Sequence, residues 1–168
     1  MKNLLSTNPN NWTALIARLT LGLVIFPHGA QKLFGWFGGY GFNGTMGFLT
    51  GMVHLPWILA LLVILIESIG ALFLIAGFLT RLAAVGMFIN FLGIIYTSHL
   101  HSGYFMNWAR QPNTGEGIEY HLLILGLSLA LLISGGGKAS LDATLTSSAS
   151  GTQRSGNSKK EGKKYEHA

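Results

Sequence analysis

Four long apolar stretches dominate this sequence and restrict what it can fold into. They lie at residues 13–34, 57–79, 81–98 and 118–133, the last being the shortest. A helix of about 20 apolar residues crosses the hydrocarbon core of a bilayer. Only 10% of the residues are charged, compared with about 25% in soluble domains. We therefore predict an all-α fold, an integral membrane bundle of four transmembrane helices.

The distribution of charge divides the chain into three parts. We expect an N-terminal segment at residues 1–12, the membrane domain at residues 13–143 and a disordered basic tail at residues 144–168. The tail has five basic and two acidic residues, so it carries +3 of the formal net charge of +5. The basicity therefore lies outside the bundle, which argues against nucleic-acid binding. The tail is either solvated or in contact with anionic lipid.

Lysine and arginine also predict the orientation, because loops rich in these residues stay in the cytoplasm. Lys2, Arg81 and Lys138 fall on the same side as the termini, whereas Lys32 and Arg110 fall on the other. We expect both termini in the cytoplasm. A cleaved signal peptide is disfavoured, because no small-x-small cleavage site follows the first apolar run.

Two charged residues lie inside the predicted spans and need partners. Arg18 is in the first span and Glu67 is near the middle of the second. A charge at the centre of a span costs about 2.5–3.5 kcal/mol on insertion scales. From their depths we predict a buried pair between Arg18 and Glu67. The pair is either structural, fixing which helix faces meet, or functional, as a proton-relay or ligand-binding group.

Small residues follow the face of the first span that carries Arg18. Gly22, Ile25, Gly29 and Lys32 continue from Arg18 in steps of three and four. Small residues at this spacing let helix backbones approach closely in a membrane. We predict that this stripe faces a neighbouring helix.

A second polar group is expected at the outer end of the bundle. The candidate ligand-binding residues are His28, Lys32, His99, His101 and His121. Three interpretations are open: interfacial capping of the bundle, a metal or haem site, and a quinone pocket. A quinone headgroup needs polar donors, a titratable group and an apolar slot. We expect no metal, because no tight ligand spacing such as HExxH occurs.

The two long connections, residues 35–55 and 99–117, are rich in aromatic residues. Aromatic rings beside apolar spans usually lie at the membrane interface, and a ligand-stacking platform is the alternative. The chain has no cysteine, which excludes disulfides, iron–sulfur ligation and electron transfer through paired cysteines. No glycine-rich turn between a strand and a helix indicates a flavin or nicotinamide site.

Several motifs resemble those of the DoxX family of membrane proteins. The run ARLTLGLVIFPHGAQKLFG, which ends at Gly35, is similar to the first segment of that family. Glu67, Gly70, the turn GFLTRL that ends at Leu82, and the closing Ser-Leu-Asp at Asp142 continue the resemblance. It covers about residues 14–143.

The resemblance implies a bacterial or archaeal inner-membrane protein of four helices. Family members are commonly labelled oxidoreductases, a label that descends from subunits associated with quinol oxidase and thiosulfate:quinone oxidoreductase. By resemblance, this chain is a quinone-linked membrane component that carries no covalently bound cofactor and receives electrons from a redox enzyme subunit. A homo-oligomer is the other assembly considered. The alternative function is a non-enzymatic membrane scaffold or a small-solute permeation factor.

The resemblance also matches several polar positions, although it transfers no assigned catalytic residue. The matching positions are Arg18, His28, Lys32, Glu67, Arg81 and Glu119. From these we take Glu67, Arg18 and Glu119 as the catalytic candidates.

Overall fold

The computed structural model describes residues 5–112 and 114–147, and that part of the chain is helical without any β-strand. Within it, three helical spans are long and apolar enough to cross a membrane. The first span is α2 (Trp12–Phe34). The second consists of α4 (Trp57–Leu65), the π turn η2 (Ile66–Gly70) and α5 (Ala71–Ala76), which follow one another without a break. The third consists of α6 (Thr80–Ile94) and the π turn η3 (Ile95–His99). A shorter apolar helix, α7 (Glu119–Ser134), follows. The prediction of an all-α membrane fold is confirmed to this extent.

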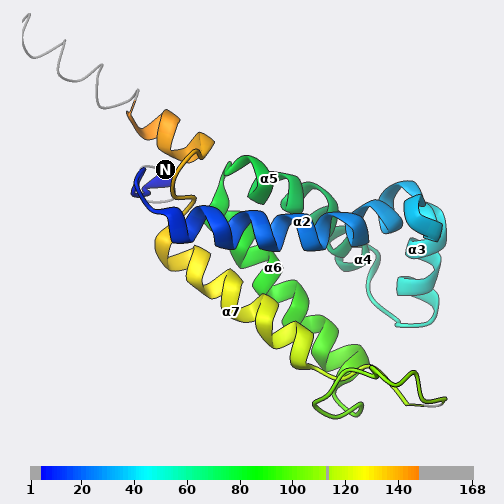
Figure 1. Ribbon diagram of the computed structural model, residues 1–168. Helices are drawn as coiled ribbons and strands as arrows, with labels where there is room; N and C mark the ends of the chain where they lie inside the picture. Colours follow the sequence, from blue (N-terminus) through cyan, green and yellow to red (C-terminus); the bar gives the residue numbers. More distant parts are fainter. Residues whose placement is uncertain (1–4, 113, 148–168) are drawn as a thin grey trace, which may run out of the picture.

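The helices pack as two layers that cross and then diverge (Figure 1). α2 lies along α5, and the antiparallel pair α6 and α7 crosses beneath them. At one end, residues before α2 are hydrogen-bonded to residues after α7, as in the bond from the Lys138 amide to the Asn11 carbonyl at 3.0 Å. The beginning and the end of the described chain therefore meet. At the other end, α3 (Gly41–Gly51) and the loop formed by residues 100–112 and 114–118 lie apart.

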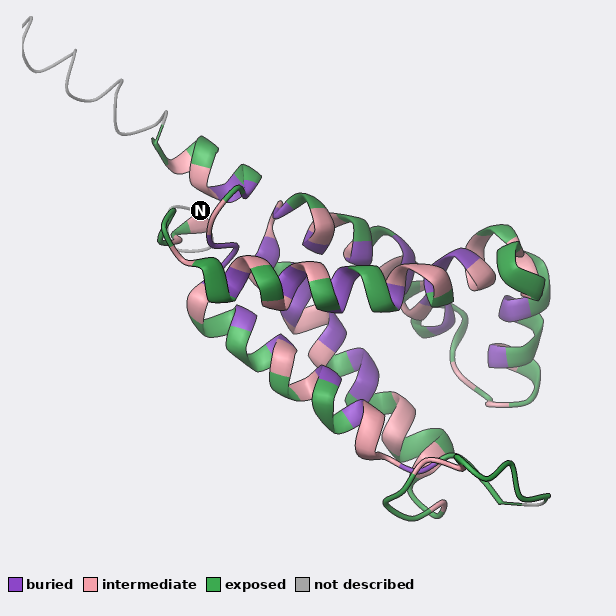
Figure 2. Cartoon of the chain, viewed as in Figure 1, coloured by how far each residue is buried: buried purple, intermediate pink, exposed green. Residues whose placement is uncertain are grey.

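The core lies where the two layers cross, and large apolar side chains cover the outside. Leu21, Leu74 and Met87 are fully buried in the main cluster, and the buried positions of each helix face the interior (Figure 2). By contrast, Leu123 and Ile133 of α7 are 69% and 72% exposed. An outer surface of this kind suits contact with lipid rather than with water.

The stripe of small residues on α2 is buried as predicted. A Cβ atom on Gly22 would lie 2.8 Å from the Ile75 side chain, and one on Gly29 would overlap the backbone carbonyl of Glu67. Gly22, Ile25 and Gly29 are all buried. These glycines therefore set how closely α2 approaches α5 and η2.

Alanine should have opposite effects at Gly29 and at Gly47, because the space around these two glycines differs. We expect Gly29→Ala to destabilise the protein by about 1–3 kcal/mol, because overpacking forces the backbones of α2 and η2 apart. Gly47 lies in α3, and a Cβ there would meet nothing within 4 Å. Gly47→Ala should therefore stabilise the protein by up to about 1 kcal/mol through helix propensity. Thermal unfolding in detergent measures both, and equal destabilisation by the two variants would contradict the packing argument.

The connection at residues 35–55 contains a helix, α3, that the sequence did not predict. Four of its eleven residues are glycine, and each glycine costs about 0.8–1 kcal/mol relative to alanine in a helix interior. Met46 and Leu49 are buried, and together with Ala60 and Ile64 of α4 they form a second apolar cluster. Tertiary packing against α4 thus outweighs the poor helix propensity of α3.

The segment after α7 folds back onto the bundle and caps α6. Asp142 is 1% exposed, and its two carboxylate oxygens accept hydrogen bonds from the amides of Leu79 (2.8 Å) and Thr80 (2.9 Å). These amides begin α6 and have no partner within the helix. Residues 141–147 are helical, so residues 144–147, assigned to the tail from sequence, continue this helix. Residues 148–168, with the charged part of the tail, lie outside the described residues.

Removing this cap should destabilise the start of α6. Asp142→Ala leaves two buried amides without an acceptor, and loss of a helix N-cap costs about 0.5–2 kcal/mol. Asp142→Asn keeps one oxygen acceptor and should lose less. Thermal unfolding of the two variants checks the order, and an Asn variant that is the less stable of the two would contradict it.

Candidate functional site

Arg18 is buried in α2 and donates hydrogen bonds only to backbone carbonyls among the described residues. It is 2% exposed. Its guanidinium has five N–H donors, and five carbonyls accept from its three nitrogens. The acceptors are Leu74 and Ile75, near the end of α5, and Gly136, Lys138 and Ala139, which follow α7. Arg18 therefore satisfies carbonyls at a helix end and fastens the segment after α7 to α5.

The predicted pair between Arg18 and Glu67 is wrong. Gly29 of α2 lies against Glu67, whereas Gly22 lies against Ile75. This offset places Arg18 beside the end of α5 and brings the far end of α2 beside Glu67. The prediction compared depths from opposite faces of the membrane, and such depths do not fix the offset between two helices.

Glu67 instead forms a buried centre with one residue from α2 and one from α6. Its Oε2 atom lies 2.5 Å from Lys32 Nζ, and its Oε1 atom accepts a hydrogen bond of 3.1 Å from Asn90 Nδ2. The Glu67 side chain is 2% exposed and that of Lys32 is 27% exposed. We call these three residues the Lys32–Glu67–Asn90 centre. It joins a buried carboxylate to a cation that still reaches an open space.

The helix that carries Glu67 changes to a π turn at this point. Before η2 the buried positions are Ala60 and Ile64, and after it they are Ala71 and Leu74. Within η2, both Glu67 and the next residue are buried. A π turn inserts one extra residue into a helix and is frequent at functional sites. Glu67 lies in steps of three and four on the same stripe as Ile64 and Ala71, so this spacing already directs it inward, and at the π turn Ser68 is buried beside it.

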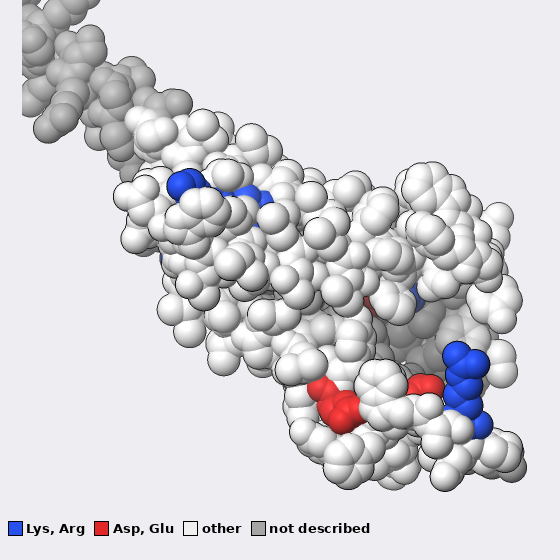
Figure 3. Space-filling model, in the orientation of Figure 1, with Lys and Arg blue, Asp and Glu red and all other residues white. Residues whose placement is uncertain are grey.

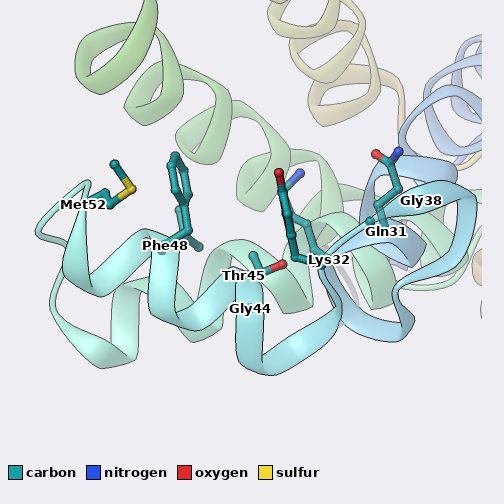
Figure 4. A pocket seen from close by; sticks show the side chains of 10 residues that line it. Gln31, Lys32, Gly38, Gly44, Thr45, Phe48 and Met52 are labelled. Atoms are coloured by element: carbon teal, nitrogen blue, oxygen red, sulfur yellow. The ribbon is translucent and has the colours of Figure 1, made fainter.

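A cavity of about 630 Å³ opens beside Lys32, between the end of α2 and α3. Gln31 and Lys32 come from α2, Thr45 and Phe48 come from α3, and Met52 follows α3 directly (Figure 4). The space-filling view shows a hollow at this end of the molecule, with basic and acidic atoms at its back (Figure 3). The volume lies within the range of about 300–1,000 Å³ typical of small-molecule sites.

His28 lies near enough to Lys32 and Glu67 to interact with both electrostatically, but the other candidate histidines do not gather around this centre. His28 and His101 are exposed, whereas His121 is 6% exposed and its ring centroid lies 4.3 Å from that of His99. His121 Nδ1 has no hydrogen-bond partner among the described residues. Lys32 is thus the one candidate ligand-binding residue that belongs to the centre. No group of three or more His, Cys, Asp and Glu side chains within residues 5–112 and 114–147 could hold a metal ion.

Glu119, the third catalytic candidate, holds the loop that precedes α7. Its Oε1 atom accepts hydrogen bonds from the Met106 amide (3.0 Å) and from Trp108 Nε1 (2.7 Å). Glu116 similarly accepts from the Asn107 amide at 2.8 Å. The contacts of Glu119 therefore hold residues 106–108 against the start of α7 and do not reach the Lys32–Glu67–Asn90 centre.

Asn90 is the residue of the centre that sequence reasoning missed. It is 7% exposed and lies in the third apolar span. A polar amide inside an apolar helix usually bonds to another helix, and this rule could have marked Asn90 as a partner for a buried charge. The prediction considered charged residues alone.

The fold and the buried ionic centre define a multi-pass helical membrane protein. The chain belongs to the DoxX family, whose sequence pattern matches residues 13–100. It is 29% identical to "Putative oxidoreductase CatD" of Bacillus subtilis (strain 168) over 117 residues, which are 70% of this chain and 76% of that protein. No solved structure matches the chain.

Proposed function

We propose that this protein binds a quinone headgroup in the cavity beside Lys32 and serves as the membrane component of a redox system. The observation that carries the proposal is the Lys32–Glu67–Asn90 centre at the edge of a cavity of about 630 Å³. Charged groups inside a membrane are costly and usually mark function. The family and the name of the Bacillus relative support a link to redox chemistry.

The side chains around the cavity suit a quinone. A quinone carbonyl accepts hydrogen bonds, and a lysine ammonium has three N–H donors, of which Glu67 takes one. The Thr45 hydroxyl and the Phe48 ring also line the cavity, and they offer a polar contact and an aromatic face. Reduction of a quinone adds two electrons and two protons. In this proposal a partner redox enzyme supplies the two electrons, and solvent that enters the cavity supplies the two protons. The Lys32 ammonium stabilises the negative charge that develops on the carbonyl oxygen before it is protonated.

The proposal includes a four-crossing topology in the inner membrane with both termini in the cytoplasm. The pairing of the two ends of the described chain supports an even number of crossings. α7 has 16 residues, which at 1.5 Å per residue gives about 24 Å. That is shorter than the hydrocarbon core of about 30 Å, and a short span is accommodated by local thinning of the bilayer. Alkaline phosphatase fused to the C-terminus should be inactive, and activity would reverse the orientation.

Quinone binding tests the proposed function directly. Equilibrium dialysis of the purified protein with a tail-less dimethoxy-methyl-benzoquinone should show saturable binding. The charge-balanced variant Lys32→Met/Glu67→Gln should fold, because it leaves no unpaired charge, but should lose at least about tenfold in affinity, or 1.4 kcal/mol. The matched control Lys138→Met removes a cation at the opposite end of the bundle, where Lys138 lies over the Trp12 ring, and should bind as the wild type does.

The alternative of a non-enzymatic scaffold rests on a specific observation, the Arg18 network. All five donors of Arg18 are used to join structural segments, so this half of the bundle needs no ligand to explain its buried charge. Wild-type protein that folds but binds no quinone would favour the scaffold.

A further inference from the structure

A second cavity, of about 240 Å³, lies between α3, α4 and α6 and adjoins the first. We infer that it holds the hydrocarbon tail of the quinone whose headgroup lies beside Lys32, an inference that rests on the proposed function. Phe48 and Leu49 line both cavities. The two cavities are therefore neighbours across these two residues of α3, and in this inference one amphiphilic ligand occupies both.

The Lys32–Glu67–Asn90 centre also links the two cavities. Lys32 lines the first cavity and Asn90 lines the second, and both are bound to the carboxylate of Glu67. A headgroup at Lys32 would therefore lie two hydrogen bonds away from Asn90 in the wall of the second cavity. The ring and its tail would occupy neighbouring spaces on either side of Phe48.

The second cavity presents apolar walls, because its polar residues already have partners. Asn90 Nδ2 donates to Glu67, and Thr97 Oγ1 donates to the Gly93 carbonyl at 2.9 Å. Ser98 Oγ lies 3.3 Å from Thr97 Oγ1. The rest of the lining is mainly aliphatic and includes Val63 of α4 and Ile89 of α6. Such a space suits a hydrocarbon chain better than a polar headgroup.

Gly93 of α6 provides the width of this cavity. A Cβ atom at Gly93 would meet nothing within 4 Å, so a larger side chain would project into the space without distorting α6. Gly126 of α7 is also an exposed helical glycine with open space around it, but it does not line the cavity. Gly93→Leu and Gly126→Leu therefore form a matched pair that differs in whether the tail slot is filled.

Gly93→Leu should reduce the affinity for a tailed quinone only through the van der Waals contacts that the tail loses. A tail that moves from lipid into this cavity stays in an apolar environment and gains no hydrophobic free energy. In a bilayer, Gly93→Leu should weaken binding of a prenyl-tailed quinone by about threefold to tenfold through lost dispersion contacts. Binding of the tail-less quinone should be unchanged. Gly126→Leu should alter neither affinity.

Photolabelling of the wild-type protein tests the position of the tail without any variant. A quinone with a diazirine on its prenyl tail should label peptides from α4 and α6 more strongly than the lipid-facing side of α7, and excess unlabelled tailed quinone should remove the label. Equal labelling of α4, α6 and α7, or equal labelling of this cavity by a phosphatidylcholine that carries a diazirine on its acyl chain, would overturn the inference. The tail-less quinone separates the two proposals: its failure to bind refutes the headgroup site, whereas its binding with scattered tail labelling refutes only the tail slot.

Discussion

Replacing Arg18 by alanine should abolish stable folding. Five carbonyls near the end of α5 and after α7 would lose their donor, and because two of these bonds are buried and three are partly buried, water replaces the guanidinium only in part. Each buried carbonyl left without a donor costs about 1–3 kcal/mol, so losing several of them removes a large share of the stability of about 5–15 kcal/mol usual for a folded protein. Size-exclusion chromatography in detergent should show aggregated protein or a strongly lowered melting temperature.

Arg18→Lys and Arg110→Ala are informative companions. Lysine keeps the charge but has three donors instead of five, so Arg18→Lys should be nearly as unstable as Arg18→Ala. Arg110 is exposed, and its replacement removes an arginine at little cost. A monodisperse Arg18→Lys protein with the wild-type melting temperature would show that charge alone suffices and that the five-carbonyl network is not what stabilises the bundle.

Breaking the Lys32–Glu67 pair from one side should be the second most severe change. Lys32→Met leaves a buried carboxylate without its cation, and Glu67→Gln leaves the ammonium without its carboxylate. Lys32→Met should lose about 3–5 kcal/mol of stability because the carboxylate left behind is buried, whereas Glu67→Gln should lose less because the Lys32 side chain is 27% exposed. The double variant should recover most of the loss, because no unpaired charge remains. Thermal unfolding of the wild type, the two single variants and the double variant gives the coupling energy.

The same four proteins separate structure from function at this centre. Asn90 keeps an acceptor in Glu67→Gln, since the glutamine carbonyl can replace Glu67 Oε1. A double variant that is stable but does not bind quinone would assign the pair to the ligand. Losses of stability that simply add in the double variant would mean that the two side chains do not interact, contrary to their separation of 2.5 Å.

The spans and the identity of the buried charges were predictable, but their partners were not. α2 and α6 begin within one residue of the predicted starts, because long apolar stretches have few alternatives in a membrane. Glu67 was marked by its charge inside a span. Its partner Lys32 was placed at the outer end and its other partner, Asn90, was overlooked, since both contacts depend on how α2 and α6 are offset and rotated against η2. The π turn has no signal in the apolar pattern.

The local sequence similarly failed to predict α3 and the role of the segment after α7. Glycine content argues against a helix at residues 41–51, and the helix forms because Met46 and Leu49 pack against α4. In the sequence, Asp142 lies at the boundary of a polar tail, yet its carboxylate caps α6, a helix that begins 62 residues earlier.

The sequence by itself thus determined that this protein consists of apolar helices with a few costly charges among them, because composition and the length of apolar runs decide how a chain meets a bilayer. Only the tertiary structure decided which partners those charges have. Close contacts at Gly22 and Gly29 fix the offset of α2 along α5 and η2. That offset places Arg18 beside backbone carbonyls and Lys32 beside Glu67. Such contacts act between residues far apart in the chain, and spacing along the sequence does not contain them.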